Sequence, residues 1–533
     1  MTHFGSNDPR TRLRLVAAGV ALAFAAVGVQ LVRIAALPRQ EARIAILEAV
    51  PQALPRPDIV DRRGRLLATD VMAPSLFADP WMVVDPGDTA DRLVALFPDL
   101  DARELRRSLA DRTRRFVWIK RGLSPRIAQV VHDLGLPGLG FRNEPRRTYP
   151  GVRLAGHVIG TVGTENQGLA GIERRIDAER GPDGARARDP GPPLRLTLDL
   201  GVQHGLEAEL SDAMTRYRAA GAAGVVLDAE TGEVLALASL PAVDPARLSE
   251  SLDPARADKV TGGVYELGSI FKMVTVAMAL DHKLAGLETV LDVRVPLTAG
   301  RWQIRDSHPA GRPLTVRDVF IQSSNVGAGM LALETGPLRQ RAFLDRLGLT
   351  AAMRTEAGPV APPKMPKSWG RAETITIAYG HGLAVAPLQF AAAAASLVNG
   401  GYAVTPTLVA DPGPPAPRTR VVAATTSQAI RELMRRNVTA PKGTGRRAEV
   451  AGLDIGGKTG TAELPGRGGY DESAVISSFL AAFPMSAPRH VVLLSLFEPK
   501  PTAETGGQIA AGATAAPAAG RLVARIAPLL LAQ

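Results

Sequence analysis

Ser269 and Lys272, a serine and a lysine three residues apart, are the side chains in this chain best suited to chemistry. Residues at that spacing share one face of a helix, so the hydroxyl and the amine would meet. Serine is a weak nucleophile until a base takes its proton, and this pair provides both. Gly268 precedes the serine, and residues 270–280 contain no Pro or Gly. The serine is therefore predicted at a helix start, where free backbone N–H groups point at whatever binds.

Two later fragments, Ser323-Ser324-Asn325 and Lys458-Thr459-Gly460, complete a known set. S-x-x-K, S-D-N and K-T-G in this order mark penicillin-binding proteins and class A β-lactamases, and the middle fragment here reads S-S-N. Singly, each fragment has an ordinary explanation, such as a solvated helix surface or a turn. Each lies in a longer matching string, and together they predict one acyl-transfer site: YELGS at 265–269, SSNVG at 323–327 and GKTGTA at 457–462.

On these strings the chain resembles a class B penicillin-binding protein of the division-specific, FtsI-like type. That family comprises membrane-anchored D,D-transpeptidases that cross-link peptidoglycan. The resemblance covers nearly the whole chain, with three departures. Leu267 stands where the family often has Pro, Arg63 where it has Asn, and Ala386 where it often has Thr. Loss of the proline could loosen the turn before the nucleophile, because Pro restricts the backbone there.

The resemblance implies a role for each catalytic residue. Ser269 attacks the carbonyl between the two terminal D-alanines of a stem peptide, which releases D-Ala and leaves an acyl-enzyme. Lys272 is the expected base, provided that Lys458 and burial keep its amine partly neutral; which lysine holds the proton at each step stays open. Ser323 would relay a proton to the leaving amine, and Asn325 would hydrogen-bond the peptide backbone of the substrate.

The third fragment is expected to hold the substrate. Lys458 and Thr459, with Thr461 beyond Gly460, would bind the terminal carboxylate of the stem peptide, a charge that β-lactams share. The backbone N–H groups of Ser269 and Thr461 would form the oxyanion hole. The amine of a neighbouring stem peptide would then complete the cross-link. No metal, nucleotide or other cofactor is required, and the eight histidines are interpreted as structural or surface residues.

One competing motif overlaps the third fragment. Residues 452–459 (GLDIGGKT) satisfy the P-loop pattern of nucleotide-binding proteins. A P-loop needs a buried strand before it and a helix after it. Residues 446–451 (RRAEVA) are not an apolar strand, and Pro465 and three glycines follow soon after the motif. The context argues against a nucleotide site.

Composition fits a large exported enzyme. The 533 residues, 46% of them apolar, are enough for two or three domains. Cysteine is absent, which excludes disulfide and thiol chemistry and suits an oxidising periplasm. The net charge of +11 could indicate nucleic-acid binding. The arginines, however, are interleaved with acidic residues, and only 4% of residues are aromatic, so few stacking platforms exist. We expect no nucleic-acid partner.

The N-terminal region predicts a membrane anchor. Residues 15–32 are uncharged and mostly apolar, and residues 34–37 extend the run beyond Arg33. A cleaved signal peptide is the alternative, but its apolar core is shorter and ends at a small-residue cleavage site. Arginines flank the run on both sides, so charge alone leaves the orientation open. The resemblance implies a single pass through the inner membrane, with the N-terminus inside and the enzyme in the periplasm, at the division septum.

Four segments are predicted on this basis. Residues 1–14 form a cytoplasmic tail, 15–37 the anchor, 38–193 a non-catalytic pedestal resembling the family's dimerisation domain, and 194–533 the transpeptidase domain. Residues 180–193 (RGPDGARARDPGPP) are interpreted as the connection. The fold class is α+β, with an antiparallel sheet flanked by helices. A hairpin is predicted within 224–239, a helix near 202–217, another near 388–398, the K-T-G fragment on a strand, and irregular structure over 506–519.

Other functions stay open on the sequence. A β-lactamase or D,D-carboxypeptidase would use the same motifs without needing an anchor and pedestal. An elongation-type transpeptidase is the nearest rival, although S-S-N favours division. A catalytically idle scaffold or β-lactam sensor would also keep the pocket, but sensors of that kind carry several membrane spans. No glycosyltransferase module is evident, so the resemblance implies a polytopic glycan polymerase of the FtsW type, with other divisome proteins, as partners.

Overall fold

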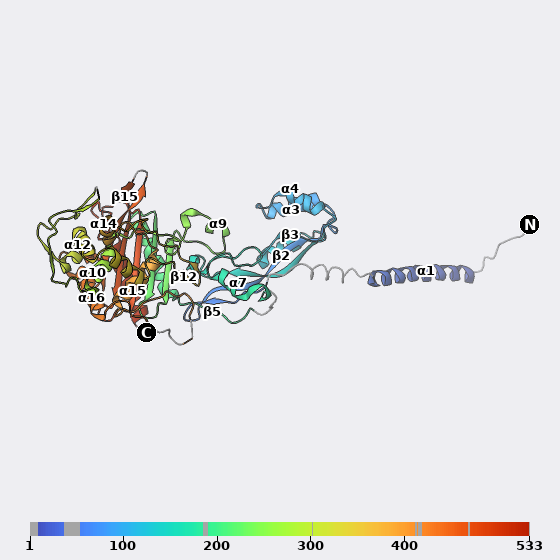
Figure 1. The fold of residues 1–533 in the computed structure, drawn as a ribbon. Helices are drawn as coiled ribbons and strands as arrows, with labels where there is room; N and C mark the ends of the chain where they lie inside the picture. Colours follow the sequence, from blue (N-terminus) through green and yellow to red (C-terminus); the bar gives the residue numbers. More distant parts are fainter. Residues whose placement is uncertain are drawn as a thin grey trace, which may run out of the picture. The chain divides into compact units, whose positions relative to one another are not determined.

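A computed structural model describes residues 9–36, 54–184, 190–300, 302–410, 413, 418–466 and 469–531. Two compact units contain these residues. The first combines Met1–Ala53 with Met72–Arg146, and the second combines Leu54–Val71 with Arg147–Gln533. Part of the predicted pedestal therefore shares a unit with the predicted transpeptidase domain. The ribbon in Figure 1 follows the chain through both units.

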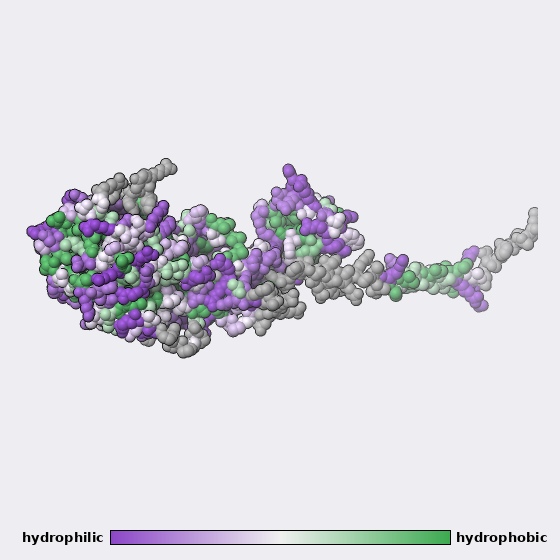
Figure 2. Space-filling view, in the orientation of Figure 1, coloured by the Kyte–Doolittle hydropathy of each residue, from purple (hydrophilic) through white to green (hydrophobic). Residues whose placement is uncertain are grey.

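Helix α1 (Pro9–Ala36) contains the apolar run near the N-terminus. Its 24 residues Arg10–Arg33 are long and apolar enough to cross a bilayer, and none of that stretch is buried against the rest of the protein. Figure 2 shows the apolar surface of α1 bounded by hydrophilic residues at both ends. The helix fits the predicted transmembrane anchor. Residues 1–8 of the predicted tail and residue 37 of the predicted anchor lie outside the described residues.

The first unit packs three capped helices against short strands. Asp85, Asp101 and Ser124 cap the helices α3 (Pro86–Leu96), α4 (Ala102–Ala110) and α5 (Pro125–Asp133) through their side-chain oxygens. The later residues of β2 (Leu66–Ala78) pair antiparallel with β3 (Val117–Lys120), and β4 (Leu139–Thr148) pairs with β2. Apolar residues from these helices and strands form one separate core.

The second unit begins with a small sheet and two helices. Strand β1 (Ile59–Val60) pairs antiparallel with β2 and parallel with β5 (Leu194–Arg195), and α6 (Gly156–Ile159) and α7 (Gly171–Gly184) follow β4. Helix α7 runs to Gly184, so the predicted connection from residue 180 is helical in its first five residues. Residues 185–189 of that connection lie outside the described residues.

A five-stranded antiparallel sheet forms the centre of the second unit, in the order β14-β15-β16-β6-β7. Its strands are β6 (Gly221–Asp228), β7 (Val234–Leu240), β14 (Gly456–Gly466), β15 (Gly469–Phe483) and β16 (His490–Phe497). The predicted hairpin is confirmed as β6 and β7, and the predicted α+β class with a flanked antiparallel sheet is confirmed. The K-T-G fragment lies on β14 at one edge of the sheet. The chain remains a strand after Thr459, so no P-loop helix follows.

Helices cover both faces of this sheet because its strands are apolar on both sides. On one face, α8 (Leu200–Arg216) and α17 (Ala515–Leu531) pack against alternate strand residues such as Val226 and Val492. On the other, α10 (Lys272–Asp281) and α15 (Pro387–Val398) share a core with Val225 and Val491. Helix α15 is buried along its whole length. Figure 1 shows α10, α15 and α16 grouped together beside the sheet.

The remaining helices surround α10 and position the two serine motifs. They are α11 (Val316–Ile321), α12 (Asn325–Thr335), α13 (Pro337–Arg346), α14 (Arg371–Ala378) and α16 (Ala424–Thr439), with the short α9 (Leu248–Ser251) apart from them in the chain. The short strands are β8 (Val290–Leu291), β9 (Leu297–Ala299), β10 (Trp302–Ile304), β11 (Leu314–Thr315), β12 (Arg354–Thr355) and β13 (Gly358–Pro359). The 3₁₀ turns are Pro254–Arg256, Gly268–Phe271 and Arg446–Ala448.

The irregular structure predicted over residues 506–519 is wrong at its C-terminal end, because α17 begins at Ala515. Pro517 lies in the first turn of that helix, where its missing N–H costs nothing. Gly520 allows the helix to approach the chain closely, since an added Cβ would lie 3.0 Å from the Ala448 carbonyl oxygen. Pro517 and Gly520 are therefore both compatible with a packed helix.

Candidate active site

Ser269 lies in the 3₁₀ turn Gly268–Phe271, which leads directly into α10. In a 3₁₀ turn residues three apart eclipse each other, and Lys272 Nζ lies 2.8 Å from Ser269 Oγ. Among the described residues, Lys272 supplies the only nitrogen hydrogen-bonded to that hydroxyl. The predicted pairing of nucleophile and amine is present in the structure.

The buried amine of Lys272 has further partners in the second motif. Its Nζ lies 2.7 Å from the Ser323 carbonyl oxygen, 3.1 Å from Ser323 Oγ and 2.7 Å from Asn325 Oδ1. The carbonyl and amide oxygens can only accept, so they take two N–H groups. A neutral amine has two N–H groups and one lone pair, and that lone pair is left for the proton of Ser269. The contacts match those of a general base.

Lys458 lies on the other side of Ser323. Its Nζ donates to Ser323 Oγ at 3.0 Å and to the carbonyl oxygen of Thr459 at 3.1 Å, and it lies 5.9 Å from the centre of the Phe320 ring. Ser323 Oγ therefore lies between two amines. The Ser323 backbone has a left-handed φ of 62°. In this conformation the Ser323 hydroxyl contacts both lysines and its carbonyl oxygen contacts Lys272.

Burial lowers the pKa of both lysine amines. Lys272 and Lys458 are each 0% exposed. Desolvation is the main cause that holds the pKa of Lys272 well below the usual lysine value, and the charge of Lys458 adds to it, while Asp306 opposes it. Desolvation alone lowers the pKa of Lys458 to about 7. One lysine can thus be neutral while its neighbour carries a proton at neutral pH.

Strand β14 places its residues on two faces. Thr459, Thr461 and Glu463, which alternate along the strand, line the pocket, whereas Lys458 and Gly460 do not line it, and the Lys458 amine contacts Ser323. An added Cβ at Gly460 would lie 2.4 Å from the Leu267 carbonyl oxygen, so only glycine fits there. One at Gly268, which has a φ of +56°, would lie 2.4 Å from the Thr461 carbonyl oxygen. The Ser269 turn and the K-T-G strand therefore touch backbone to backbone.

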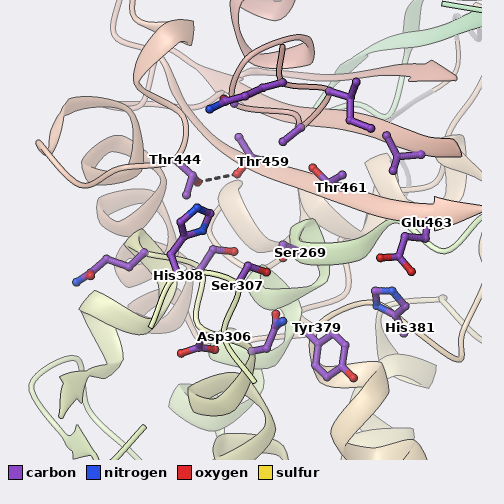
Figure 3. A pocket seen from close by; sticks show the side chains of 18 residues that line it. Ser269, Asp306, Ser307, His308, Tyr379, His381, Thr444, Thr459, Thr461 and Glu463 are labelled. Atoms are coloured by element: carbon purple, nitrogen blue, oxygen red, sulfur yellow. Dashed lines mark hydrogen bonds between the residues drawn. The ribbon is translucent and has the colours of Figure 1, made fainter. Parts of the chain in front are cut away.

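The pocket is a cavity of about 710 Å³ with Ser269 near its middle. In Figure 3, Thr444 and Thr459 lie on one side of the serine, and His381 and Glu463 on the other. The residues that line it are Ser269, Asp306, Ser307, His308, Gln322, Ser323, Asn325, Tyr379, His381, Thr444, Thr459, Thr461, Glu463, Val475, Gln508, Ile509, Ala510 and Gly512.

Hydrogen bonds fix the threonines that line the pocket. Thr459 Oγ1 donates to Thr444 Oγ1 at 2.6 Å, and Thr444 Oγ1 and the Thr444 N–H donate in turn to Asn437 Oδ1 at 3.1 and 3.2 Å. Thr461 Oγ1 accepts from the Ala511 N–H at 3.0 Å. Hydrogen bonds within the protein thus fix the positions of the Thr459 and Thr461 hydroxyls.

Sequence reasoning missed several pocket residues. Thr444 and Asp306 lie outside the three motifs, and nothing in their local sequence marks them. His308, which is exposed, and His381 both line the pocket, and the interpretation of the histidines as structural or surface residues stays a prediction. The string Tyr379-Gly380-His381-Gly382 was the one signal that could have located His381, because a glycine on each side lets a loop approach a site closely.

Comparison with known proteins agrees with this geometry. A model of the penicillin binding protein transpeptidase domain matches residues 222–520, and one of the penicillin-binding protein dimerisation domain matches residues 51–184. A probable peptidoglycan D,D-transpeptidase FtsI from Caulobacter vibrioides is 38% identical over 89% of this chain and 81% of its own length. The chain belongs to the class B penicillin-binding proteins. Its predicted enzyme class, a peptidoglycan D,D-transpeptidase, is confirmed by these relationships.

Further relatives support this class B penicillin-binding protein assignment. The peptidoglycan D,D-transpeptidase FtsI of Escherichia coli K12 is 30% identical over 85% of this chain and 81% of its own length. Crystal structures of penicillin binding protein 3 from Mycobacterium tuberculosis, one in the apo form and one in complex with aztreonam, superpose with a TM-score of 0.69 at 25% identity. They cover 90% of this chain and 97% of their own. The fold and the order of the domains are shared.

Proposed function

We propose that this chain cross-links septal peptidoglycan during cell division, and that Ser269 carries the acyl group in the reaction. The observation that supports this most directly is the 2.8 Å contact between Ser269 Oγ and Lys272 Nζ. The amine is buried, and its pKa lies well below the usual lysine value. A buried, largely neutral amine beside a hydroxyl is an activated serine nucleophile.

Acylation follows from these contacts. Lys272 takes the proton of Ser269 as Oγ attacks the carbonyl carbon between the two terminal D-alanines of a stem peptide. The new oxyanion faces the backbone N–H groups of Ser269 and Thr461, a placement supported by the close approach of Gly268 to Thr461. The C–N bond then breaks, and Ser323, which contacts both lysines, gives its proton to the departing D-Ala amine and takes in its place the proton that Lys272 removed from Ser269, so that Lys272 is neutral again. The product is an ester between Ser269 and the donor stem.

Substrate binding uses the edge position of β14. Of the described strands, only β15 pairs with β14, so β14 is an edge strand, to which an extended peptide would add by strand pairing. The side chains of Thr459 and Thr461 face the pocket, and Lys458 supplies positive charge close by. These groups would hold the terminal carboxylate of the donor, while Asn325 would bind its peptide backbone.

The amine of a second stem peptide would complete the cycle. It attacks the ester carbonyl, loses a proton to Lys272 and releases Ser269 Oγ with its proton restored, which leaves one amide cross-link. A β-lactam would enter the same cycle, because its ring amide occupies the position of the scissile bond and it carries the same carboxylate. Its amine leaving group stays tethered after ring opening and blocks the second amine, so the ester persists.

The location and partners are also part of the proposal. Helix α1 supports a single-pass anchor in the inner membrane, with residues 1–14 in the cytoplasm, 15–37 in the membrane, and the pedestal (38–193) and transpeptidase domain (194–533) in the periplasm. Both domain types match family models. The anchor and pedestal would bind a polytopic glycan polymerase of the FtsW type and other divisome proteins at the septum.

Labelling of the purified full-length protein with a fluorescent penicillin tests the chemistry. Stable label on the wild type that vanishes in Ser269→Ala would support the acyl-enzyme. Ser251→Ala, at an exposed serine on α9, is the matched control and should label like the wild type. No label on a folded wild type would overturn the acyl-enzyme proposal and favour an idle scaffold. Label that forms and disappears within minutes would indicate a hydrolase instead.

Depletion of the protein in growing cells tests the cellular role. We expect filaments, because cells that elongate without septal cross-linking fail to divide. Round cells would overturn the division assignment and favour an elongation-type transpeptidase. Microscopy of the depleted strain, complemented with the wild type or with Ser269→Ala, separates loss of catalysis from loss of the protein as a scaffold.

A further inference from the structure

Asp306 lies outside the second motif, Ser323-Ser324-Asn325, but forms hydrogen bonds with this motif and with the residue after it. The residue lies in the segment after β10 and is partly buried at the pocket wall. Its Oδ2 accepts from Ser324 Oγ at 2.7 Å, and its Oδ1 accepts from the Val326 N–H at 3.0 Å. The carbonyl oxygen of its neighbour Arg305 accepts from Asn325 Nδ2 at 3.3 Å. Two adjacent residues thus hold three consecutive residues of the S-S-N-V string.

This anchoring acts on a turn that is unfavourable by itself. Ser323 has a φ of 62°, a left-handed conformation that a residue with a Cβ rarely adopts. Ser324 follows as the N-cap of α12, and its Oγ accepts from the Gly327 N–H at 2.9 Å while its own proton goes to Asp306. The Asp306 carboxylate therefore stabilises both the helix start and the turn that points Ser323 at the lysines.

We infer that Asp306 is a positioning residue, whose carboxylate holds the S-S-N turn so that Ser323 and Asn325 meet the amine of Lys272. The inference rests on the proposed function, because it assigns Asp306 a part in the acylation of Ser269. In the part of the chain that the structure describes, no hydrogen bond joins Asp306 to Ser269, so Asp306 acts through the turn. Nothing in the three sequence motifs includes this residue.

The charge of Asp306 also affects the pKa of the Lys272 amine. Two ionisable groups act on the Lys272 amine, Lys458 from β14 and Asp306 from the segment after β10, and the charge of Lys272 acts in turn on His381 from the turn after α14. Of these, Asp306 is the one that raises the pKa of Lys272, against desolvation and Lys458. Removal of its charge would lower that pKa further. The acidic limb of the acylation profile, where Lys272 becomes protonated, would then move to lower pH.

Two substitutions separate the hydrogen bonds from the charge. Asp306→Ala removes both, and the turn is expected to lose its position, which would slow acylation by a fluorescent penicillin about ten-fold or more. Asp306→Asn is nearly isosteric, so its oxygen can still accept from Val326 and its amide can donate to Ser324. This variant is expected to acylate within about three-fold of the wild type, with its acidic limb at lower pH. Asp318→Asn, at an aspartate paired with the exposed Arg312, is the control.

The outcomes keep this inference separate from the proposed function. Failure of the wild type to acylate would overturn the proposed function. With an active wild type, Asp306→Ala within about two-fold of it would overturn the positioning role. A slow Asp306→Ala together with an Asp306→Asn that acylates within about three-fold of the wild type supports it, and an unshifted acidic limb in Asp306→Asn would overturn only the effect of the Asp306 charge on Lys272. If Asp306→Ala does not fold, acylation by Asp306→Asn more than about three-fold slower than the wild type would overturn the positioning role by hydrogen bonds.

Discussion

Two groups of buried cations lie in the second compact unit, and they differ in their partners. Arg56 and Arg147 share the carboxylate of Glu173, with Nε–Oε distances of 2.8 and 2.7 Å, and the three residues are at most 5% exposed. Lys272 and Lys458 are equally buried, yet their partners among the described residues are hydroxyl, carbonyl and amide oxygens. One group pairs its charges, and the other does not.

The difference follows from the chemistry of the two side chains. A guanidinium keeps its proton in proteins, so a buried arginine requires an anion. A lysine can escape the cost of burial by losing its proton, and the lowered pKa values of Lys272 and Lys458 show that response. A cation buried beside a carboxylate therefore stabilises the fold as an ion pair, whereas a lysine buried without a carboxylate can lose its proton and act as a base. The comparison predicts different consequences for substitutions in each group.

Lys272→Arg is expected to have the largest effect. Arginine keeps the positive charge but cannot accept the proton of Ser269, so acylation by penicillin should fall about 10³-fold. The acylation rate, measured from the growth of fluorescent label, checks this. Lys367→Arg, at an exposed lysine, should leave the rate unchanged. Substantial acylation by Lys272→Arg would show that burial without a carboxylate does not identify the base here.

Glu173→Gln should have the next largest effect, on stability and not on catalysis. It leaves Arg56 and Arg147 buried with an incomplete set of anions, which costs about 3–5 kcal/mol for a broken buried pair. The unfolding midpoint in urea should fall, while the folded fraction still acylates. Glu179→Gln, which breaks an exposed pair with Arg175, should cost less than about 1 kcal/mol. Equal effects of the two substitutions would contradict the distinction between buried and exposed pairs.

Lys458→Met is expected to stabilise the protein by about 1–2 kcal/mol near pH 7, because it removes a buried amine that has no anionic partner among the described residues. Burial lowers the pKa of Lys458 from 10.5 to about 7, so between these values the unfolded chain holds a proton that the folded chain lacks. Wild-type stability therefore rises with pH over this window, and the advantage of the variant should shrink.

Urea unfolding of Lys458→Met and wild type at several pH values from 7 to 10 measures this trend. Lys442→Met, at an exposed lysine, is the control and should show no such pH-dependent gain. A loss of stability in Lys458→Met at pH 7 would mean that its hydrogen bonds to Ser323 and Thr459 outweigh desolvation. The buried lysines would then resemble the arginine group, and the contrast would fail.

The parts of this molecule that are periodic or local were predictable. The contact between Ser269 and Lys272 follows from a spacing of three, and β6 with β7 follows from two apolar runs around a turn. Lys458, Gly460 and the two threonines were located by their motif. These features depend on short stretches of sequence, so tertiary context did not need to be known.

The parts that depend on distant contacts were not predictable. Asp306 precedes Ser324 by 18 residues, and Thr444 precedes Thr459 by 15, so their contacts exist only after the intervening chain has folded. The start of α17 was missed, and the close approach of Gly520 to Ala448, which packs this helix, joins residues 72 positions apart. The triad of Arg56, Arg147 and Glu173 joins residues up to 117 positions apart. No local pattern marks any of these pairs.

Thr444→Val offers the smallest effect and tests a third kind of polar group, a neutral pair of hydroxyls. The substitution removes the acceptor of Thr459 Oγ1 but keeps the shape of the side chain, so Thr459 loses one hydrogen bond of about 1 kcal/mol. Acylation by penicillin should fall about three- to ten-fold, with the loss in β-lactam binding and not in the chemical step, because Thr459 is proposed to hold the carboxylate. Thr439→Val, at an exposed threonine on α16, is the control. A loss confined to the chemical step would instead place Thr444 with the proton-transfer groups, alongside the unpaired lysines.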